Sequence, residues 1–115
     1  MTTITFHSAD SRLDGFVVEG HSGYAEEGSD IVCAAVSAAV GLVECTVNDV
    51  LGLEASVKIR PQDARIAFRL PGGLSEVNEQ TCQNLLAGLM VYLEGVSEEY
   101  PENLAVLLDG DDEDD

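Results

Sequence analysis

The segment from Ile31 to Leu51 is the feature that most limits how this chain can fold. Apolar or small side chains recur here at almost every turn of a helix, and no charged side chain occurs before Glu44. A helix that is apolar on more than one side has to bury more than one side. We therefore expect this helix to pack against a sheet and against something else, for which a second subunit is a candidate.

Strand patterns lie on both sides of this helix. Residues 3–8 alternate apolar and polar side chains and are rich in β-branched residues, and residues 13–19 continue the signal, which predicts an opening strand pair. Residues 56–60 and 65–70 alternate in the same way around Pro61-Gln62-Asp63. This second pattern predicts a β-hairpin.

The two faces of the predicted hairpin differ in charge. Because successive side chains of a strand point to opposite faces, the apolar residues share one face and the basic residues share the other. Four of the five basic residues of the chain belong to that second face: Lys58, Arg60, Arg65 and Arg69. One face of the sheet is therefore expected to be in contact with water.

A second amphipathic helix is predicted after Gly72-Gly73. Ser75 is a suitable N-cap, and Pro101 cannot continue the helix. Apolar residues at helical spacing form its expected core stripe: Val77, Leu85, Leu86, Leu89, Met90 and Leu93. The apolar run 104–108 is expected to close the sheet as a last strand.

The predicted elements define the fold class and the domain organisation. The order ββαββα followed by β predicts an α+β two-layer sandwich, with a mostly antiparallel sheet and two helices on one face. Residues 1–108 are expected to form a single domain. Residues 109–115 contain six acids and one Gly, which is typical of a solvated, disordered tail, with a basic partner as the alternative function.

The charge balance excludes several classes of function. The chain has 22 acidic and 5 basic residues, a formal net charge of -17 and a pI near 4.1. So acidic a chain, with Lys58 as its single Lys, is not expected to bind nucleic acid or anionic lipid directly, because that binding depends on many Lys and Arg side chains. We found no apolar run of membrane-spanning length and no basic segment leading into one at Met1, so we expect a cytoplasmic protein without a membrane association.

The three cysteines are odd in number and form no close pair, which favours reduced thiols over a disulfide framework or a zinc site. We expect no metal and no cofactor. Cys45 and Cys82 lie within apolar helical stretches, and packing is their expected role. Cys33 differs, because it stands where the first helix is expected to begin.

His21 and Cys33 form a candidate catalytic pair at the end of a strand and the start of a helix. If Asp30 is the N-cap, Cys33 occupies the first turn, where the helix dipole and unpaired N–H groups stabilise a thiolate and can act as an oxyanion hole. His21 would transfer the proton. The intervening residues, among them Ser22, Gly23 and Gly28, are suited to a substrate-contacting loop. The alternative is structural, with Cys33 as a small buried hydrophobe and His21 as the end of a strand.

A family resemblance bears on this choice. Gly20-His21, followed by Asp30-Ile31-Val32-Cys33-Ala34-Ala35-Val36-Ser37, resembles the signature of Prp, the ribosomal-processing cysteine protease family of bacteria. The similarity extends to the length, the order of elements and Glu99-Tyr100-Pro101. It implies a homodimeric Cys-His endopeptidase that removes a short N-terminal extension from ribosomal protein twenty-seven of the large subunit. It also implies that Cys33 is the nucleophile and His21 the general base.

Two further residues match the family pattern. Asp30 either caps the helix or orients His21, and the position before an apolar helical run favours the cap. Ser37 lies one turn beyond Cys33, where its hydroxyl either bonds near the catalytic pair or bonds to a carbonyl four residues back. Both residues therefore enter the candidate site in a supporting role.

The acidic body departs from the family pattern. A negative surface would attract a basic ribosomal protein and raise its encounter rate, although it would equally serve solubility. Two other functions are compatible with these residues. One is a non-catalytic acidic binding module for ribosomal proteins or assembly factors, and the other is a thiol enzyme that acts on a different acyl substrate.

Overall fold

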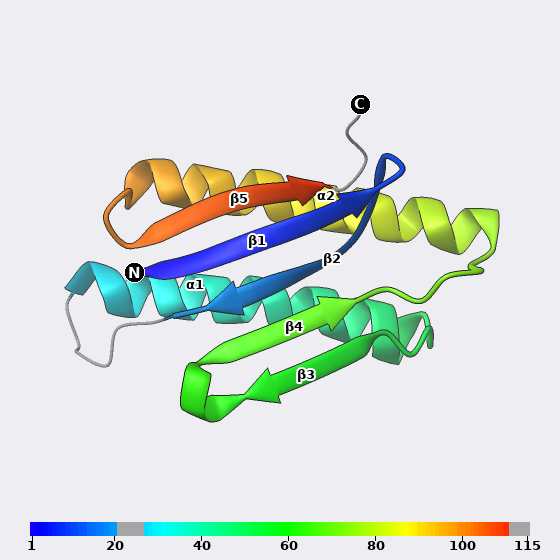
Figure 1. The fold of residues 1–115 in the computed structure, drawn as a ribbon, viewed down its shortest axis with the longest axis horizontal. Coiled ribbons are helices and arrows are strands. Elements are labelled where there is room, and N and C mark those ends of the chain that lie inside the picture. The colour runs from blue at the N-terminus through cyan, green and yellow to red at the C-terminus, as the bar shows by residue number, and fades with distance from the viewer. Residues whose placement is uncertain (21–26, 111–115) are drawn as a thin grey trace.

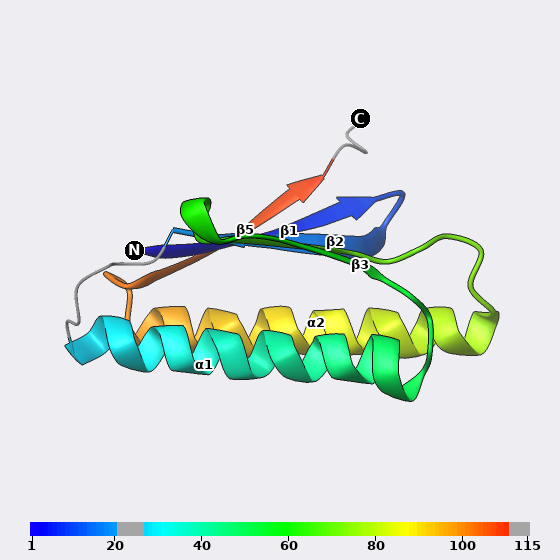
Figure 2. The same ribbon diagram turned by 90° about the horizontal axis from the view of Figure 1, so that it is seen from below.

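Two helices cover one face of a five-stranded sheet in the computed structural model, which describes residues 1–20 and 27–110 (Figures 1 and 2). The elements follow in the order β1 (Thr2–Ala9), β2 (Arg12–Glu19), α1 (Glu27–Glu44), a π-helical turn (Cys45–Val50), β3 (Ser56–Arg60), a 3-10 turn (Pro61–Asp63), β4 (Arg65–Arg69), α2 (Glu76–Glu99) and β5 (Leu104–Gly110). The predicted α+β class and the predicted order of elements are confirmed.

The sheet has the strand order β3-β4-β2-β1-β5. The pairs β1–β2, β2–β4 and β3–β4 are antiparallel, and β5 is parallel to β1. The sheet is therefore mostly antiparallel, as predicted. β5 continues through Gly110, two residues beyond the boundary expected at 108, and residues 111–115 lie outside the described part of the chain.

Successive side chains of each strand point to opposite faces of the sheet. The inner face packs against the helices, and the outer face is exposed to water. Phe6, Phe16 and Phe68 pair directly across three strands and are at most 2% exposed. Their ring centroids lie 5.7 Å apart for Phe6–Phe16 and 4.9 Å apart for Phe16–Phe68. Burial of one such side chain stabilises the fold by roughly 1.5–3 kcal/mol, so this row anchors the sheet to the helix layer.

Helix α1 packs one side on the inner face of the sheet. Its buried residues recur at intervals of three and four: Val32, Val36, Val40, Val43 and, in the π-helical turn, Val47. Leu42 on the other side is 65% exposed. By length and composition Ile31–Val50 would be long enough and apolar enough to cross a membrane, which corrects our expectation that no such run exists. The buried valines identify it as the core helix of this domain.

Helix α2 begins and ends where the sequence predicts. The Ser75 hydroxyl accepts a hydrogen bond from the Asn78 N–H at 3.1 Å, and the helix ends at Glu99, two residues before Pro101. Leu86, Leu89 and Leu93 are buried, and Leu85 and Met90 are partly buried. Val77 was predicted to be in this core stripe, which is wrong, because it is 75% exposed in the first turn.

Candidate active site

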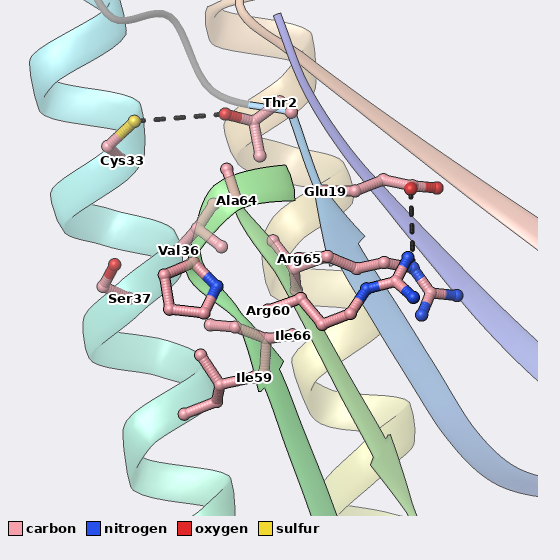
Figure 3. A pocket seen from close by; sticks show the side chains of 13 residues that line it. Thr2, Glu19, Cys33, Val36, Ser37, Ile59, Arg60, Ala64, Arg65 and Ile66 are labelled. Atoms are coloured by element: carbon pink, nitrogen blue, oxygen red, sulfur yellow. Dashed lines mark hydrogen bonds and ion pairs between the residues drawn. The ribbon is translucent and has the colours of Figure 1, made fainter.

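A cavity of about 410 Å³ lies between the first half of α1 and the ends of β2, β3 and β4 (Figure 3). It is the meeting point of segments that are distant in the sequence. Its lining comprises Thr2, Val18, Glu19, Gly20, Cys33, Val36, Ser37, Ile59, Arg60, Pro61, Ala64, Arg65 and Ile66. Two predicted site residues, Cys33 and Ser37, are therefore part of one cavity wall.

The Cys33 thiol is half-buried on the side of α1 that faces the sheet (Figure 3). Its Sγ lies 4.0 Å from the Thr2 Oγ1, and Thr2 is 5% exposed. The Thr2 N–H in turn donates a hydrogen bond to the Asn103 carbonyl at 2.9 Å. The start of β1 thus holds a hydroxyl beside the thiol, and Thr2 had no signal in the sequence because 31 positions separate it from Cys33.

Helix α1 begins earlier than the sequence predicts, and this changes the environment of Cys33. The helix starts at Glu27, so that Asp30 is its fourth residue and Cys33 its seventh. The expectation that Asp30 is the N-cap is therefore wrong, as is the placement of Cys33 in the first turn. Unpaired N–H groups and the field of the dipole are concentrated in the first turn, so they do not provide an oxyanion hole at the Cys33 amide.

Ser37 lies one turn after Cys33 and lines the same cavity. Within the described part of the chain, its hydroxyl makes no hydrogen bond to the carbonyl four residues back. That observation removes the backbone-bonding role. The other interpretation, a hydroxyl near the catalytic pair, remains a prediction.

The predicted substrate loop ends earlier than expected, because α1 begins at Glu27 and includes Gly28. His21, Ser22 and Gly23 lie outside the described residues, and Gly28 belongs to the first turn of α1. Gly20 is described, and its N–H donates to the Ala64 carbonyl at 3.2 Å. The residue that precedes His21 is therefore held at the rim of the Cys33 cavity.

The β3–β4 hairpin supplies the wall opposite α1, a contribution that sequence reasoning missed. Ile59 and Ile66 pair directly and face the cavity from β3 and β4. The alternation pattern predicts that both residues are on the inner face of the sheet. The alternation pattern does not indicate that this end of the hairpin lies opposite Cys33. The pairing of β4 with β2 brings the hairpin to that position.

The rim of the cavity is charged. The Arg65 Nε lies 3.7 Å from the Glu19 Oε1, and the two residues pair across β4 and β2 (Figure 3). Arg60 is the cross-strand neighbour of Arg65. The other lining residues are mainly apolar, so the cavity combines apolar walls with a few charged residues at the ends of β2, β3 and β4.

The remaining thiols differ from Cys33 and from each other. Cys82 is fully buried, and burial raises the pKa of its thiol, with a smaller contribution from Glu79. Its predicted packing role is confirmed. Cys45 was also assigned to packing, which is wrong, because its side chain is exposed. Among residues 1–20 and 27–110, no group of three or more His, Cys, Asp or Glu side chains is placed to hold a metal ion.

Comparison with known proteins assigns the family. The sequence profile of the family described as Cysteine protease Prp matches residues 1–105. The chain is 33% identical to the ribosomal processing cysteine protease Prp of Bacillus subtilis over 99 residues, which are 86% of this chain and 88% of that protein. It is 30% identical over 100 residues to the protein of the same name from Staphylococcus aureus, covering 83% of this chain and 86% of the relative.

A solved structure shares the fold. The crystal structure of the ribosomal processing protease Prp of Staphylococcus aureus with a substrate peptide superposes with a TM-score of 0.79 at 23% identity, covering 94% of this chain and 99% of that chain. An α+β sandwich with a thiol in the cavity between its layers, in a chain related to thiol proteases, defines a cysteine protease. This chain belongs to the Prp family of ribosomal processing cysteine proteases.

Proposed function

We propose that this protease removes the N-terminal extension of ribosomal protein twenty-seven of the large subunit, with Cys33 as nucleophile and His21 as general base. The observation that carries the proposal is the Cys33 thiol on the wall of a cavity large enough for a substrate side chain, about 410 Å³. The names of the relatives from Bacillus subtilis and Staphylococcus aureus support a ribosomal substrate.

The chemistry is a two-step acyl transfer. His21 takes the thiol proton, the Cys33 sulfur attacks the scissile carbonyl carbon, and the C–N bond breaks as His21 returns the proton to the leaving amine. A thioester on Cys33 results. Water, deprotonated by His21, then attacks the thioester, which releases the carboxylate of the extension and restores the thiol. Asp30 and Ser37 support this pair, and Ser22 and Gly23 belong to the substrate loop. Gly28 is in the first turn of α1 and follows that loop.

The cavity favours a particular substrate side chain. Ile59, Ile66 and Val36 form apolar walls close to Cys33. A large apolar side chain next to the scissile bond would bury its surface there, at roughly 25 cal/mol per Å². We therefore expect the extension to carry an apolar residue at the cleavage position.

The charge of the chain is compatible with this substrate. Ribosomal proteins that bind RNA are basic, and a protein of net charge -17 attracts a basic partner over a distance. We place the reaction in the cytoplasm, where the ribosomal precursor is made and where thiols remain reduced.

Cleavage of the extended ribosomal protein, followed by mass spectrometry of the products, tests the proposal. Cys33→Ala should abolish cleavage, with a loss of at least about a thousandfold, and still bind the substrate. Cys45→Ala is the matched control, because it removes an exposed thiol and should cleave at the wild-type rate. His21→Ala should slow cleavage by about a hundredfold or more. Unaltered cleavage by Cys33→Ala would overturn the mechanism.

The same experiment separates the two alternative functions. A non-catalytic acidic binding module predicts salt-sensitive binding of ribosomal proteins or assembly factors that is unaffected by Cys33→Ala, with no cleavage by any variant. A thiol enzyme with another acyl substrate predicts rapid acylation of Cys33 by small activated esters, with the ribosomal protein left intact. Either result would contradict the proposed substrate.

We further propose that the protein is a homodimer that forms through the outer side of the helix layer. Helices α1 and α2 run antiparallel in the helix layer (Figure 2). Residues of both helices line a groove of about 460 Å³. Its lining contains no charged residue: Ala38, Ala39, Leu42, Val43, Asn84, Leu85, Gly88, Leu89 and Tyr92. Leu42 and Tyr92 are 65% and 57% exposed. Two copies of so acidic a chain repel each other elsewhere, so an uncharged apolar patch is where they can meet.

Sedimentation equilibrium tests the dimer. Leu42→Glu should convert a dimer into a monomer by placing a carboxylate in the groove. Val77→Glu is the matched control, because Val77 is an exposed apolar residue of α2 outside the groove. A wild-type monomer, or a dimer that is unchanged by Leu42→Glu, would contradict this interface.

A further inference from the structure

The outer face of the sheet carries a cluster of cations in a chain that is otherwise strongly acidic. Lys58 and Arg60 of β3 and Arg65 and Arg69 of β4 lie on this face, because the registers Lys58–Ala67 and Arg60–Arg65 put all four in phase. The predicted basic face of the hairpin is thus confirmed. It contains four of the five basic residues of a chain with net charge -17.

Three of these cations surround a single small side chain, Ala67 of β4. Lys58 lies directly opposite on β3, and Arg65 and Arg69 lie two residues before and after Ala67 on the same strand. Side chains two positions apart in a strand stand about 7 Å apart. Because a methyl group sits among longer side chains, the surface is hollowed above Ala67, and these residues line a cavity of about 280 Å³.

The bottom of this hollow extends over β2 to the His7 side chain of β1. Gly15 pairs with Arg69. A Cβ at Gly15 would lie 2.3 Å from the Phe68 carbonyl oxygen, so there is no room for a side chain at this position. His7 pairs with Gly15 and also lines the hollow. Its Nδ1 lies 2.6 Å from the Asp14 Oδ1. Since a carboxylate only accepts hydrogen bonds, this contact uses Nδ1 and leaves Nε2 for another partner.

The ion pairs at the hollow leave its cations with free donor capacity. The Arg69 Nη1 lies 3.9 Å from the Asp14 Oδ2, and the Arg65 Nε lies 3.7 Å from the Glu19 Oε1. Both distances exceed the length of a direct hydrogen bond. Lys58 is exposed. A guanidinium carries five N–H donors, so each arginine can bond to an incoming oxyanion and keep its carboxylate nearby.

The surroundings of the hollow select a compact anion. Glu19 lies beside it at one end, and Asp14 lies beside it at the other. An extended polyanion such as RNA would therefore meet carboxylates on leaving the hollow, and the net charge of -17 would repel it from a distance. A single anionic group avoids the first penalty, because it contacts only the cations around Ala67. The second penalty is smaller for it, because it carries fewer negative charges than a polyanion.

We propose that the hollow above Ala67 is a binding site for the phosphate group of a small phosphorylated molecule. Phosphate offers three oxygens and up to two negative charges, which matches two arginine forks and the point charge of Lys58. The site is distinct from the Cys33 cavity and does not depend on the proteolytic function. Arg65 lines both cavities, so it is not suitable as a test position.

Titration of the ¹⁵N-labelled full chain with inorganic phosphate, at constant ionic strength maintained with KCl, tests the site. Saturable shifts of the amide signals of β4 and of the His7 imidazole signals are expected. Ala67→Leu fills the hollow while it keeps every charge and should weaken phosphate binding at least tenfold. Lys58→Gln should weaken it several-fold. Thr5→Leu is the matched control, because Thr5 lies on the same outer face beside Val17 and outside the hollow, and its affinity should equal that of the wild type.

Three results would overturn the proposal. The first is a shift that never saturates, which would indicate screening of surface charge only. The second is equal affinity in wild type and Ala67→Leu, which would mean that the hollow itself is not used. The third is acetate binding as tightly as phosphate in a parallel titration, which would assign the hollow to carboxylates instead.

Discussion

The Thr2 hydroxyl oxygen and the Cys33 sulfur lie 4.0 Å apart, and this contact joins the first strand to the helix that carries the candidate nucleophile. A hydroxyl at this distance can donate a hydrogen bond to a thiolate. Thr2 is nearly fully buried, so its side chain is fixed in place by the surrounding core. It is a positioning residue for Cys33 in the proposed mechanism.

Thr2→Val should therefore slow proteolysis without unfolding the protein. Valine keeps the branched shape and removes the hydroxyl, and the loss of one hydrogen bond to the thiolate is worth about 1 kcal/mol, or roughly a fivefold drop in kcat/KM. The rate of Cys33 alkylation by iodoacetamide at a fixed pH should also fall, because the same hydrogen bond to the sulfur is lost. Thr3→Val, at the neighbouring position on the outer face, is the control. Unchanged cleavage and an unchanged rate of Cys33 alkylation in Thr2→Val would refute the positioning role.

Ser11→Gly should stabilise the protein. Asp10 and Ser11 connect Ala9 to Arg12 in a two-residue turn, and both have positive φ, 54° and 63°. This is the turn type that favours Gly in its second position, because a Cβ is strained there. We expect the free energy of unfolding in urea to rise by about 0.5–1 kcal/mol. A decrease in the free energy of unfolding would show that the Ser11 side chain stabilises the fold by more than its strained backbone destabilises it.

Gln83→Leu should destabilise the protein by about 1–3 kcal/mol. The Gln83 amide accepts a hydrogen bond from the Leu13 N–H at 2.8 Å and donates one to the Leu13 carbonyl at 2.7 Å, so a leucine leaves two backbone groups of β2 unsatisfied. Gln80→Leu is the control, because Gln80 donates a hydrogen bond to Asn84 on the exposed side of α2. This substitution should change the free energy of unfolding by less than about 0.5 kcal/mol. If urea denaturation showed equal losses of stability in Gln83→Leu and Gln80→Leu, the two hydrogen bonds between Gln83 and Leu13 would not be important for stability.

The two other thiols should differ in their reaction with iodoacetamide. Burial raises the pKa of the Cys82 thiol, so at a given pH less thiolate is present, and the sulfur is also inaccessible. Cys82 should remain unlabelled in the native protein, whereas the exposed Cys45 should be labelled because the reagent can reach its sulfur. Peptide mass spectrometry before and after denaturation checks this, and native labelling of Cys82 would contradict its burial.

The same shift predicts the direction of a stability change with pH. The stabilisation that comes from keeping Cys82 neutral is complete below the pKa of the unfolded thiol, and it is lost as the pH rises through the higher pKa of the folded state. Wild type should therefore lose stability relative to Cys82→Ala above about pH 9. A constant difference between the two proteins from pH 7 to pH 10 would contradict this linkage.

The parts of the fold that local chemistry determines were predictable from the sequence. Alternation across 56–70 identified the hairpin and its basic face, and the Ser75 cap and Pro101 bounded α2. The covered side of α1 was not predictable, because apolar residues lie all around its first half. Cys45 was wrongly assigned to packing for a different reason, because it is in the π-helical turn after α1, and the apolar pattern does not indicate this change of helix geometry.

The candidate site was only partly predictable, for a different reason. Cys33 was identified from its neighbours in the sequence, but Thr2, Ile59 and Ile66 reach the cavity only through the strand order β3-β4-β2-β1. The start of α1 was mispredicted because Asp30 is a good cap residue by type. The helix nevertheless extends one turn further, to Glu27.

The parallel pairing of β1 with β5 has a consequence for the timing of synthesis. β1 is made first, yet its partner β5 is the last strand of the sheet, and the Thr2 N–H bonds to Asn103 just before β5 begins. Contacts between such distant segments form late, because they must first overcome the entropy of closing the whole loop. During translation the hydroxyl beside Cys33 is therefore not fixed until Asn103 and β5 have left the ribosome. A nascent protease whose sheet still lacks β5 would cleave its proposed substrate more slowly than the folded enzyme does.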